Sequence, residues 1–351
     1  MTIREWQELI AKFDRADMYG KIMRFSLMIR EAVDICLKSD FSFTGAIENI
    51  VGCGMGGSGV GLEMAKRWLV PDLKVPFEIV KDYSLPSYVS NKTLLYVASY
   101  SGNTDEMLSC LRQGIDSKAN TFTVSSGGEL RDISKEFGLN HVAIPPSSPA
   151  RAAFPFLFVP LIWLLAKSNL IPNERIDELE ESVPYIEQAL VKCGFDMEDD
   201  KNEAKSLSNT MSDRFPIVYG HGIMSAVALR FKQQLNENAK GFASQNSFPE
   251  LDHNEFEGVQ FLPMNRPLVL ILRYREEAAK LARKIELTKR MLSESYSDVI
   301  EAWGIGKSRI AEAMSLMAKL DMTSFYLSMI RGVDPSATPR ITRLGLANKG
   351  Q

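Results

Sequence analysis

Residues 51–59, VGCGMGGSG, form a glycine-rich stretch between two apolar segments, and this stretch decides how the fold is interpreted. The segment that runs into it, IENIVGCG at 47–54, favours a strand, and residues 61–69 have the pattern of a helix. Glycines at such a junction let the backbone turn sharply, and the free N–H groups at the start of a helix favour an anion. The stretch predicts a strand–turn–helix unit that binds an anion, with a tight turn without ligand as the alternative.

The same alternation of short strand-like segments and longer helical segments continues along the chain. Further strands are predicted at 77–83, 93–99, 121–126 and 141–146, with helices at 105–115 and 129–137. The pattern restarts with strands at 215–222, 267–274 and 297–304, and with helices from about 223 to 240, at 276–295 and at 308–330. Alternating strands and helices indicate parallel sheets that are covered on both faces. We therefore predict an α/β protein with two similar halves in tandem.

The remaining segments are predicted from periodicity and composition. Residues 1–44 have helical periodicity, and the two halves are expected at 45–168 and 213–333. Between them, residues 169–212 are polar and favour a helical connection, and residues 334–351 form a tail. The acidic run at 196–200 is interpreted as a solvated loop or helix end.

The composition excludes several classes of protein. The 351 residues are 45% hydrophobic and 24% charged, which argues against disorder, and the net charge of −3 predicts no nucleic-acid or membrane-surface partner. Four cysteines without CxxC spacing argue against a disulfide framework and a zinc site. The apolar run FPFLFVPLIWLLA at 154–166 is shorter than the roughly 20 residues of a spanning helix, so we expect a buried helix. Charges begin at Arg4, unlike in a signal peptide, and we expect a soluble, cytoplasmic protein.

A second loop, SYSGNT at 99–104, follows the predicted strand at 93–99 and again opens a helix. Its three hydroxyls, on Ser99, Ser101 and Thr104, beside helix N–H groups would suit a phosphate monoester. Helix capping is the alternative, but it accounts for one hydroxyl rather than three. Residues 125–128, SSGG, are a third candidate loop. Because the carboxyl ends of parallel strands meet in one crevice, we expect these loops to face a single small phosphorylated ligand.

The spacing Gly52-x-Gly54-x-x-Gly57 also matches a dinucleotide-binding fingerprint, which would indicate an oxidoreductase. A dinucleotide site has no need for the hydroxyls at 99–104, so that loop argues against this hypothesis.

The GMGGSG loop followed by SYSGNT resembles a sugar isomerase (SIS) domain. The segments PSSPAR at 146–151, LNENAK at 235–240 and ELDHNE at 250–255 are similar to archaeal-type bifunctional phosphoglucose/phosphomannose isomerases. This resemblance covers about residues 45–340. It implies two flavodoxin-like SIS domains, a homodimer, and a tail that reaches the active site. It also implies interconversion of glucose 6-phosphate, mannose 6-phosphate and fructose 6-phosphate through a cis-enediol, without metal or other cofactor.

The resemblance assigns roles to nine residues. The sugar phosphate would be lined by Gly56, Gly57 and Ser58, and its phosphate would be held by Ser99, Ser101 and Thr104. Catalysis would rest on Glu237 as the base, Arg151 as the group that stabilises charge, and His253 as the ring-opening residue. The chemistry suits these types, because a carboxylate can move a proton between neighbouring carbons, a guanidinium can stabilise an enediolate, and histidine titrates near neutrality.

Plainer interpretations of the same residues stay open. Glu237 lies in a polar helix end and could be solvated, and His253 could cap an acidic loop. We interpret His221 as a turn residue, with approach to the crevice of the second sheet as the alternative, and His141 as structural. The separated histidines form no metal-ligand pattern.

The sequence departs from the family at one position near its end. Counting from Asp334-Pro335, the position of the family's C-terminal lysine falls on Gly345, with Arg343 or Lys349 as possible substitutes. An SIS protein that binds a sugar phosphate without turnover, or with another specificity, is therefore the alternative to the isomerase.

Overall fold

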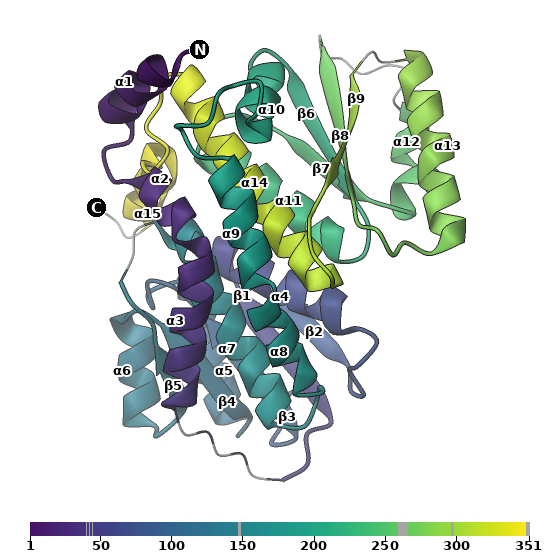
Figure 1. The fold of residues 1–351 in the computed structure, drawn as a ribbon. Coiled ribbons are helices and arrows are strands. Elements are labelled where there is room, and N and C mark those ends of the chain that lie inside the picture. Colours follow the sequence, from purple (N-terminus) through teal and green to yellow (C-terminus); the bar gives the residue numbers. More distant parts are fainter. Residues whose placement is uncertain are drawn as a thin grey trace.

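The computed structural model describes residues 1–39, 41, 43, 45–146, 149–258, 266–295 and 298–348. It contains two parallel sheets with helices around them, one sheet in each half of the chain (Figure 1). The predicted fold class is confirmed.

The first sheet has five strands in the order β2-β1-β3-β4-β5, and every neighbouring pair is parallel. Its strands are β1 (Asn49–Gly54), β2 (Phe77–Val80), β3 (Thr93–Ala98), β4 (Asn120–Ser125) and β5 (Asn140–Ala143). The connecting helices are α4 (Gly56–Leu69), α5 (Asp105–Asp116) and α6 (Gly128–Glu136). This strand order is the flavodoxin-like one, which leaves a crevice beyond the carboxyl ends of β1 and β3. Helix α4 begins at Gly56 rather than at residue 61, because the loop glycines themselves form its first turn.

The second sheet has four parallel strands in the order β7-β6-β8-β9. Its strands are β6 (Phe215–Gly220), β7 (Ser244–Ser247), β8 (Pro267–Arg273) and β9 (Val299–Trp303). Its helices are α11 (Ile223–Glu237), α12 (Glu255–Gly258), α13 (Ala279–Ser295) and α14 (Arg309–Ile330), with the short turn η2 (Glu250–His253). The polar sequence SQNS gave no strand signal for β7, which lies at the edge of the sheet. The predicted strand at 297–304 begins at Ser297, outside the described residues.

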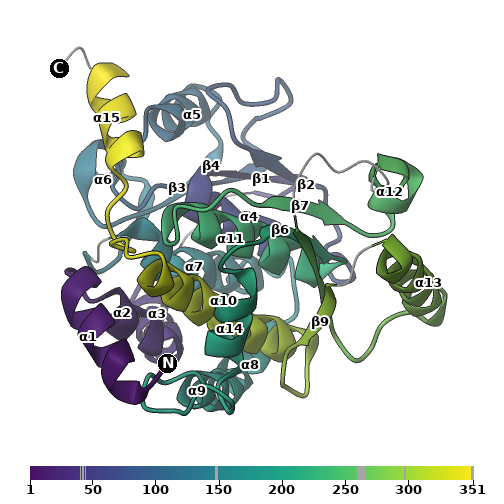
Figure 2. The same cartoon turned by 90° about the horizontal axis from the view of Figure 1, so that it is seen from above.

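The other helices surround the junction between the two halves. They are α1 (Ile3–Phe13), α2 (Met18–Met23), α3 (Phe25–Leu37), the turn η1 (Ala150–Ala153), α7 (Phe154–Lys167), α8 (Glu174–Glu181), α9 (Val183–Lys192), α10 (Glu203–Met211) and α15 (Pro339–Asn348). In Figure 2, α15 stands out from one side of the molecule and α12 and α13 lie at the other side.

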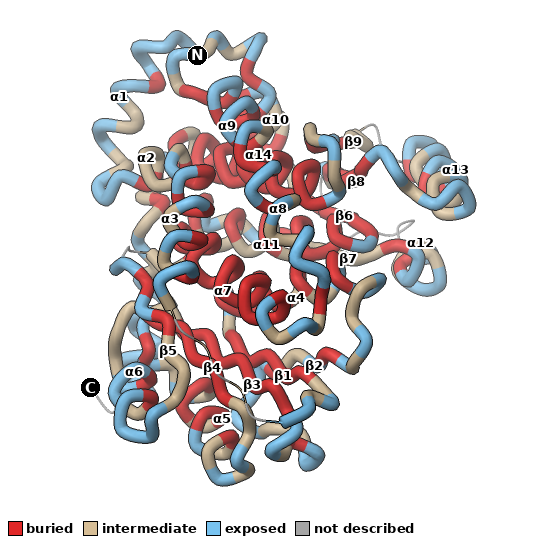
Figure 3. Tube along the Cα trace, turned by 60° about the horizontal axis from the view of Figure 1, so that its bottom comes forward, coloured by how far each residue is buried: buried red, intermediate tan, exposed pale blue. Residues whose placement is uncertain are grey.

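Both halves share their main hydrophobic core. Helix α4 of the first half packs against α11 of the second, and α11 packs against α14, so their buried side chains form one cluster with α3 and α7. In Figure 3 these helices and the central strands are buried, whereas α1 and α13 are exposed along much of their length. Smaller clusters cover the opposite faces of the two sheets. The two halves therefore do not have separate main cores, because α4, α11 and α14 pack their apolar faces together across the junction.

Helix α7 lies in this core, as predicted for a buried helix. Of the described residues, Ala150–Lys167 is the one helical stretch long and apolar enough to cross a membrane, and 89% of it is buried in the fold. Its apolar composition is accounted for by packing against α3 and α4.

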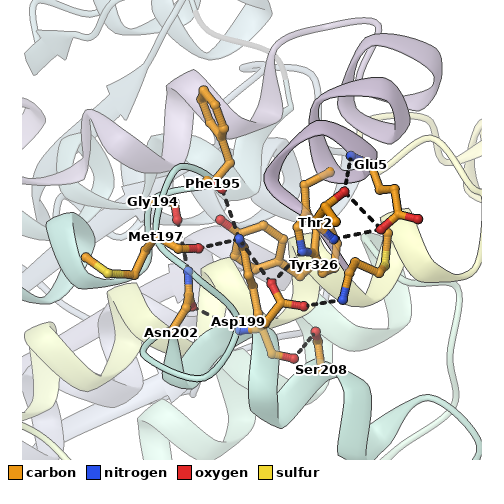
Figure 4. A network of polar contacts seen from close by, with 12 residues as sticks. Thr2, Glu5, Gly194, Phe195, Met197, Asp199, Asn202, Ser208 and Tyr326 are labelled. Atoms are coloured by element: carbon orange, nitrogen blue, oxygen red, sulfur yellow. Dashed lines mark hydrogen bonds and ion pairs between the residues drawn. The ribbon is translucent and has the colours of Figure 1, made fainter.

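The N-terminal helix α1 is attached through the acidic loop at 196–200 (Figure 4). Asp199 accepts hydrogen bonds from the Trp6 indole at 2.7 Å and from the N-terminal ammonium group at 2.8 Å. The fully buried Lys205 lies 3.3 Å from the same carboxylate and donates to the carbonyls of Phe195 and Met197. Interpreting the whole acidic run as solvated is therefore wrong for Asp199, two of whose partners come from the distant N-terminal segment.

Candidate active site

The glycine-rich loop between β1 and α4 comes close to Arg151. Gly56 has a φ of +48°, which favours glycine. A Cβ added at Gly57 would lie 3.4 Å from the Cα of Arg151, and one at Gly59 would lie 2.5 Å from the Gly54 carbonyl oxygen. Ser58 is buried in the first turn of α4. These contacts place the start of α4 against the η1 turn, so that the loop lies beside the guanidinium-bearing residue.

The loop at 99–104 follows β3, the neighbour of β1 in the sheet. Its hydroxyls organise the turn: Ser99 Oγ lies 2.8 Å from Thr104 Oγ1 and accepts from the Gly102 N–H at 3.1 Å, and Ser101 Oγ accepts from the Asn103 N–H at 3.2 Å. Thr104 precedes α5, yet its side chain makes no capping bond to the amides of that helix. The capping alternative is therefore wrong for Thr104, and the loop keeps its hydroxyls beside the amides of α5.

The third candidate loop, at 125–128, packs against the second loop, at 99–104. Ser126 donates to the Tyr100 carbonyl through both its N–H and its hydroxyl, at 2.9 and 2.8 Å. Gly102 has a φ of +71°, and an added Cβ there would overlap the Gly127 carbonyl oxygen. Ser125 and Ser126 therefore use their hydroxyls within the fold, and their contribution is to shape the loop at 99–104.

Arg151 and Glu237 form an ion pair, although 86 residues separate them in the sequence. One guanidinium nitrogen lies 3.0 Å from the Glu237 carboxylate, and Arg151 Nε donates to the Asn238 side chain at 2.6 Å. The Arg151 side chain is 5% exposed and that of Glu237 is 26% exposed. Glu237 is thus a partly buried carboxylate with a defined cationic neighbour, and its interpretation as a solvated helix-end residue is wrong.

A second, deeper ion pair holds this arrangement. Arg230 of α11 and Asp321 of α14 are 3% and 2% exposed, and they meet at 2.6 Å. Arg230 also donates to the backbone carbonyl of Arg151 at 2.9 Å. Asn238 donates to Ser324 Oγ at 2.9 Å. Helix α14 thus holds Arg230, which binds the backbone of Arg151, and Asn238, which binds its side chain.

An open cavity of about 650 Å³ adjoins Glu237. It is lined by the end of α11, by Lys240 and Phe242, and by the first turn of α15. The tail reaches the same place, because Arg151 donates to the backbone carbonyls of Pro335 and Ser336. Lys240 donates to the carbonyl of Asp334 at 2.8 Å.

His253 is not brought to this cavity within one chain. It ends η2 immediately before α12, it is exposed, and its Nε2 lies 3.4 Å from Lys284 Nζ of α13. Figure 2 shows α12 and α13 across the molecule from α15, whose first turn lines the cavity beside Glu237. The fold therefore unites Arg151, Glu237 and Gly57, and it leaves His253 on another side.

The loops that follow β6 and β8 in the second sheet carry a buried ion pair. His221 is 1% exposed and its Nε2 lies 2.9 Å from Glu277, which in turn accepts from Arg273. The Tyr274 ring lies 4.5 Å from that of His221, and its hydroxyl lies 3.4 Å from where Gly222 would carry a Cβ. His221 is therefore a buried, paired residue rather than an ordinary turn residue. These partners lie more than 50 residues away in the sequence.

The remaining candidates are His141, the basic residues near the C-terminus and the serines of the PSSPAR segment. His141, interpreted as structural, lies on β5 with its Nδ1 2.8 Å from Thr123 Oγ1. Of the C-terminal alternatives, Arg343 is exposed on α15, and Lys349 lies outside the described residues. Ser147 and Ser148 of the PSSPAR segment also lie outside them. Within the described ranges, no group of three His, Cys, Asp or Glu side chains is arranged to hold a metal ion.

The sequence analysis assigned no role to Lys240 or Asn238, and it expected the tail at the active site without identifying which of its groups take part. A usable signal exists in LNENAK, since Lys240 follows Glu237 by three residues, about one helical turn. Backbone carbonyls carry no residue identity, and no pattern of side chains could have revealed them.

Known proteins resemble this chain in both sequence and fold. Residues 200–345 match the model of the bacterial phospho-glucose isomerase C-terminal SIS domain. A bifunctional phosphoglucose/phosphomannose isomerase of Caldicellulosiruptor bescii is 32% identical over 84% of this chain and 88% of its own length. A D-glucosamine-6-phosphate 4-epimerase of Sulfolobus acidocaldarius is 29% identical over 68% of this chain and 74% of its own. The crystal structure of a hypothetical protein from Thermus thermophilus matches the fold with a TM-score of 0.75 at 16% identity, covering 99% of this chain and 93% of the other. The 32% identity over most of both chains shows that this protein belongs to the family of bifunctional phosphoglucose/phosphomannose isomerases.

Proposed function

We propose that this protein interconverts glucose 6-phosphate and mannose 6-phosphate with fructose 6-phosphate through a cis-enediol intermediate. The observation that carries the proposal is the ion pair of Glu237 and Arg151, 3.0 Å apart, beside an open cavity and next to the glycine-rich loop. A carboxylate and a guanidinium in contact are the two groups that the reaction needs at the same carbon atoms.

The phosphate is assigned to the loop at 99–104, with the sugar along Gly56, Gly57 and Ser58. The assignment is supported by the hydroxyls of Ser99, Ser101 and Thr104 beside the start of α5. Hydroxyls and helix N–H groups together stabilise a dianion.

Glu237 is assigned as the base that takes a proton from one carbon and returns it to the neighbouring carbon. When the proton leaves carbon 2 of the aldose, negative charge moves to the carbonyl oxygen at carbon 1. The guanidinium of Arg151 stabilises this charge, since it stays protonated throughout. Transfer of the hydroxyl proton from the oxygen at carbon 2 to the oxygen at carbon 1, together with the return of the proton from Glu237 to carbon 1, gives the ketose, so that no metal or other cofactor is needed.

Ring opening is assigned to His253 of a second copy of the chain. Within one chain His253 contacts Lys284 of α13, and this helix lies across the molecule from α15, whose first turn lines the cavity beside Glu237. A homodimer in which each chain lends His253 to its partner's cavity would complete two equal sites. The cytoplasm stays the predicted location.

Replacing Glu237 by Gln tests the base directly. The variant keeps the size of the side chain and a hydrogen bond to Arg151, but it cannot accept the proton. We expect kcat to fall at least about 10²–10⁴-fold, because positioned proton transfer contributes that much, while affinity for fructose 6-phosphate changes little. The measurement is a coupled assay from glucose 6-phosphate and mannose 6-phosphate, with calorimetric titration of the ligand. Turnover near that of the wild type would exclude Glu237 as the base.

A binding protein or an enzyme with another specificity is the second candidate. It is favoured by Gly345, which stands where the family has a lysine and around which an added Cβ would meet no atom within 4 Å. A binding protein would show micromolar affinity for sugar phosphates and no fructose 6-phosphate in the coupled assay. An enzyme with another specificity would convert a different phosphosugar, such as glucosamine 6-phosphate, in a direct product analysis.

A further inference from the structure

The segment that follows α14 is held by cations rather than by strand or helix bonds. Three successive carbonyls, those of Asp334, Pro335 and Ser336, accept hydrogen bonds from Lys240 and Arg151. The amides of Ser336 and Ala337 donate to the Asp334 carboxylate, which closes a small turn. The start of the tail is therefore fixed through two side chains, one from each half of the chain.

Lys240 occupies a backbone conformation that lysine normally avoids. Its φ is +53°, in the left-handed region, and the Gly241 N–H closes the end of α11 by donating to the Leu235 carbonyl at 3.0 Å. Glycine usually takes this position at a helix end, because a side chain there costs conformational energy. A strained residue at such a point suggests that its side chain is required.

The ammonium group of Lys240 joins the end of α11 to the tail. It donates to the carbonyls of Glu237 and Asn238 as well as to that of Asp334 at 2.8 Å. Lysine has three N–H donors, so these acceptors use all of them. The charged groups around it are Arg151, Glu237 and Asp334. The residue is exposed overall, but desolvation of the ammonium group and the nearby Arg151 lower the pKa of Lys240 to about 8.

We propose that Lys240 is a positioning residue that clamps residues 334–336 onto the Arg151–Glu237 site, so that the first turn of α15 closes one side of the cavity. This inference rests on the proposed function. It gives the site a lysine from the end of α11, whereas Gly345 stands at the C-terminal position where the family has a lysine. The clamp acts on the tail and on the Glu237 carbonyl, and it takes no part in proton transfer.

The test uses a substitution that suits the backbone. Lys240→Gly removes the ammonium group and relieves the left-handed strain, so the fold should be kept. Lys118→Gly is the matched control, since Lys118 is an exposed lysine at the end of α5 with a φ of +58°. Lys240→Arg is the conservative variant that restores a cation. Hydrogen exchange of the Ser336 and Ala337 amides reports the tail without any ligand, and steady-state kinetics with glucose 6-phosphate reports the site.

We expect amide exchange at 336–337 to become about ten-fold faster or more in Lys240→Gly, because a charge-assisted hydrogen bond is lost. We expect kcat to fall by a similar factor with a smaller change in KM, and Lys240→Arg to recover part of both. Exchange no faster than in Lys118→Gly would overturn the clamp, and fast exchange with an unchanged kcat would overturn its positioning role. If the wild type converts no phosphohexose at all, the proposed function fails, and hydrogen exchange alone then decides whether the clamp exists.

Discussion

Removing the cation of the buried Arg230–Asp321 pair should destabilise the protein strongly. Both side chains are at most 3% exposed, and they meet through two contacts of 2.6 and 3.2 Å. In Arg230→Met the Asp321 carboxylate stays buried without its charged partner, which costs about 3–5 kcal/mol. The unfolding entropy is about 2.1 cal/mol/K per residue, so 351 residues give about 0.74 kcal/mol/K. The expected fall in Tm is therefore about 4–7 °C.

Two further variants make this measurement decisive. Arg4→Met removes a cation from an exposed pair, whose side chains are 87% and 66% exposed, and should change the free energy of unfolding by less than about 0.5 kcal/mol. Arg230→Met combined with Asp321→Leu removes both charges and should recover most of the loss. Thermal unfolding followed by circular dichroism compares all of them. A Tm for Arg230→Met equal to that of Arg4→Met would refute the view that this pair is buried in solution.

The pH dependence of the same variant gives an independent check. Burial raises the pKa of Asp321, and Arg230 opposes this rise, so the pKa should lie further above its unfolded value when Arg230 is removed. The folded state then keeps a proton that the unfolded state loses, so the free energy of unfolding falls as the pH rises above about 4. Arg230→Met should therefore be less destabilised at pH 5 than at pH 8, relative to the wild type. The opposite order would show that Asp321 finds another cation.

Three other predictions follow from the site and the first sheet. Ser101→Ala with Thr104→Ala should raise KM for glucose 6-phosphate at least ten-fold, at about 1.5–3 kcal/mol for each charge-assisted bond, whereas Ser117→Ala at the other end of α5 should not. Burial lowers the pKa of His141 from 6.5 to about 4, so the unfolded state binds a proton first as the pH falls. The wild type should lose stability between about pH 6.5 and 4, and urea unfolding of His141→Gln should lack this contribution. Glu237→Gln and His253→Ala, each inactive alone, should regain activity as mixed dimers with one intact site, and no recovery would contradict a shared site.

Local patterns in the sequence were sufficient to predict the first half of the fold. The strand, glycine loop and helix around Gly52–Gly57 are contiguous, and their conformations depend on residues within a few positions of one another. The loop at 99–104 was predicted for the same reason. In contrast, β7 was missed because its stability comes from pairing with β6, and the polar residues SQNS give no local signal.

The long-range parts of the site could be anticipated only through the family resemblance. Glu237 and Arg151 each have an ordinary local context, and their meeting depends on how α11 packs against α4 and η1. His221 illustrates the limit of local reasoning, since its burial is produced by Glu277 and Tyr274 from the loop after β8. A histidine between two glycines has the same sequence signature whether it is solvated or enclosed.

The two halves have similar topologies but contribute differently to the site, and the difference lies in the loops that follow their strands. Beyond β1 and β3, the loops are built from glycines and hydroxyl residues, and Gly57 lies beside Arg151. Beyond β6 and β8, the Tyr274 hydroxyl lies close to Gly222, and Glu277 pairs with both His221 and Arg273. The second half instead supplies the end of α11, with Glu237 and Lys240, to the crevice of the first. Because α11 also packs against helices of both halves in one core, a change that separates the halves would move Glu237 away from the loops of the first sheet even if both sheets stayed folded.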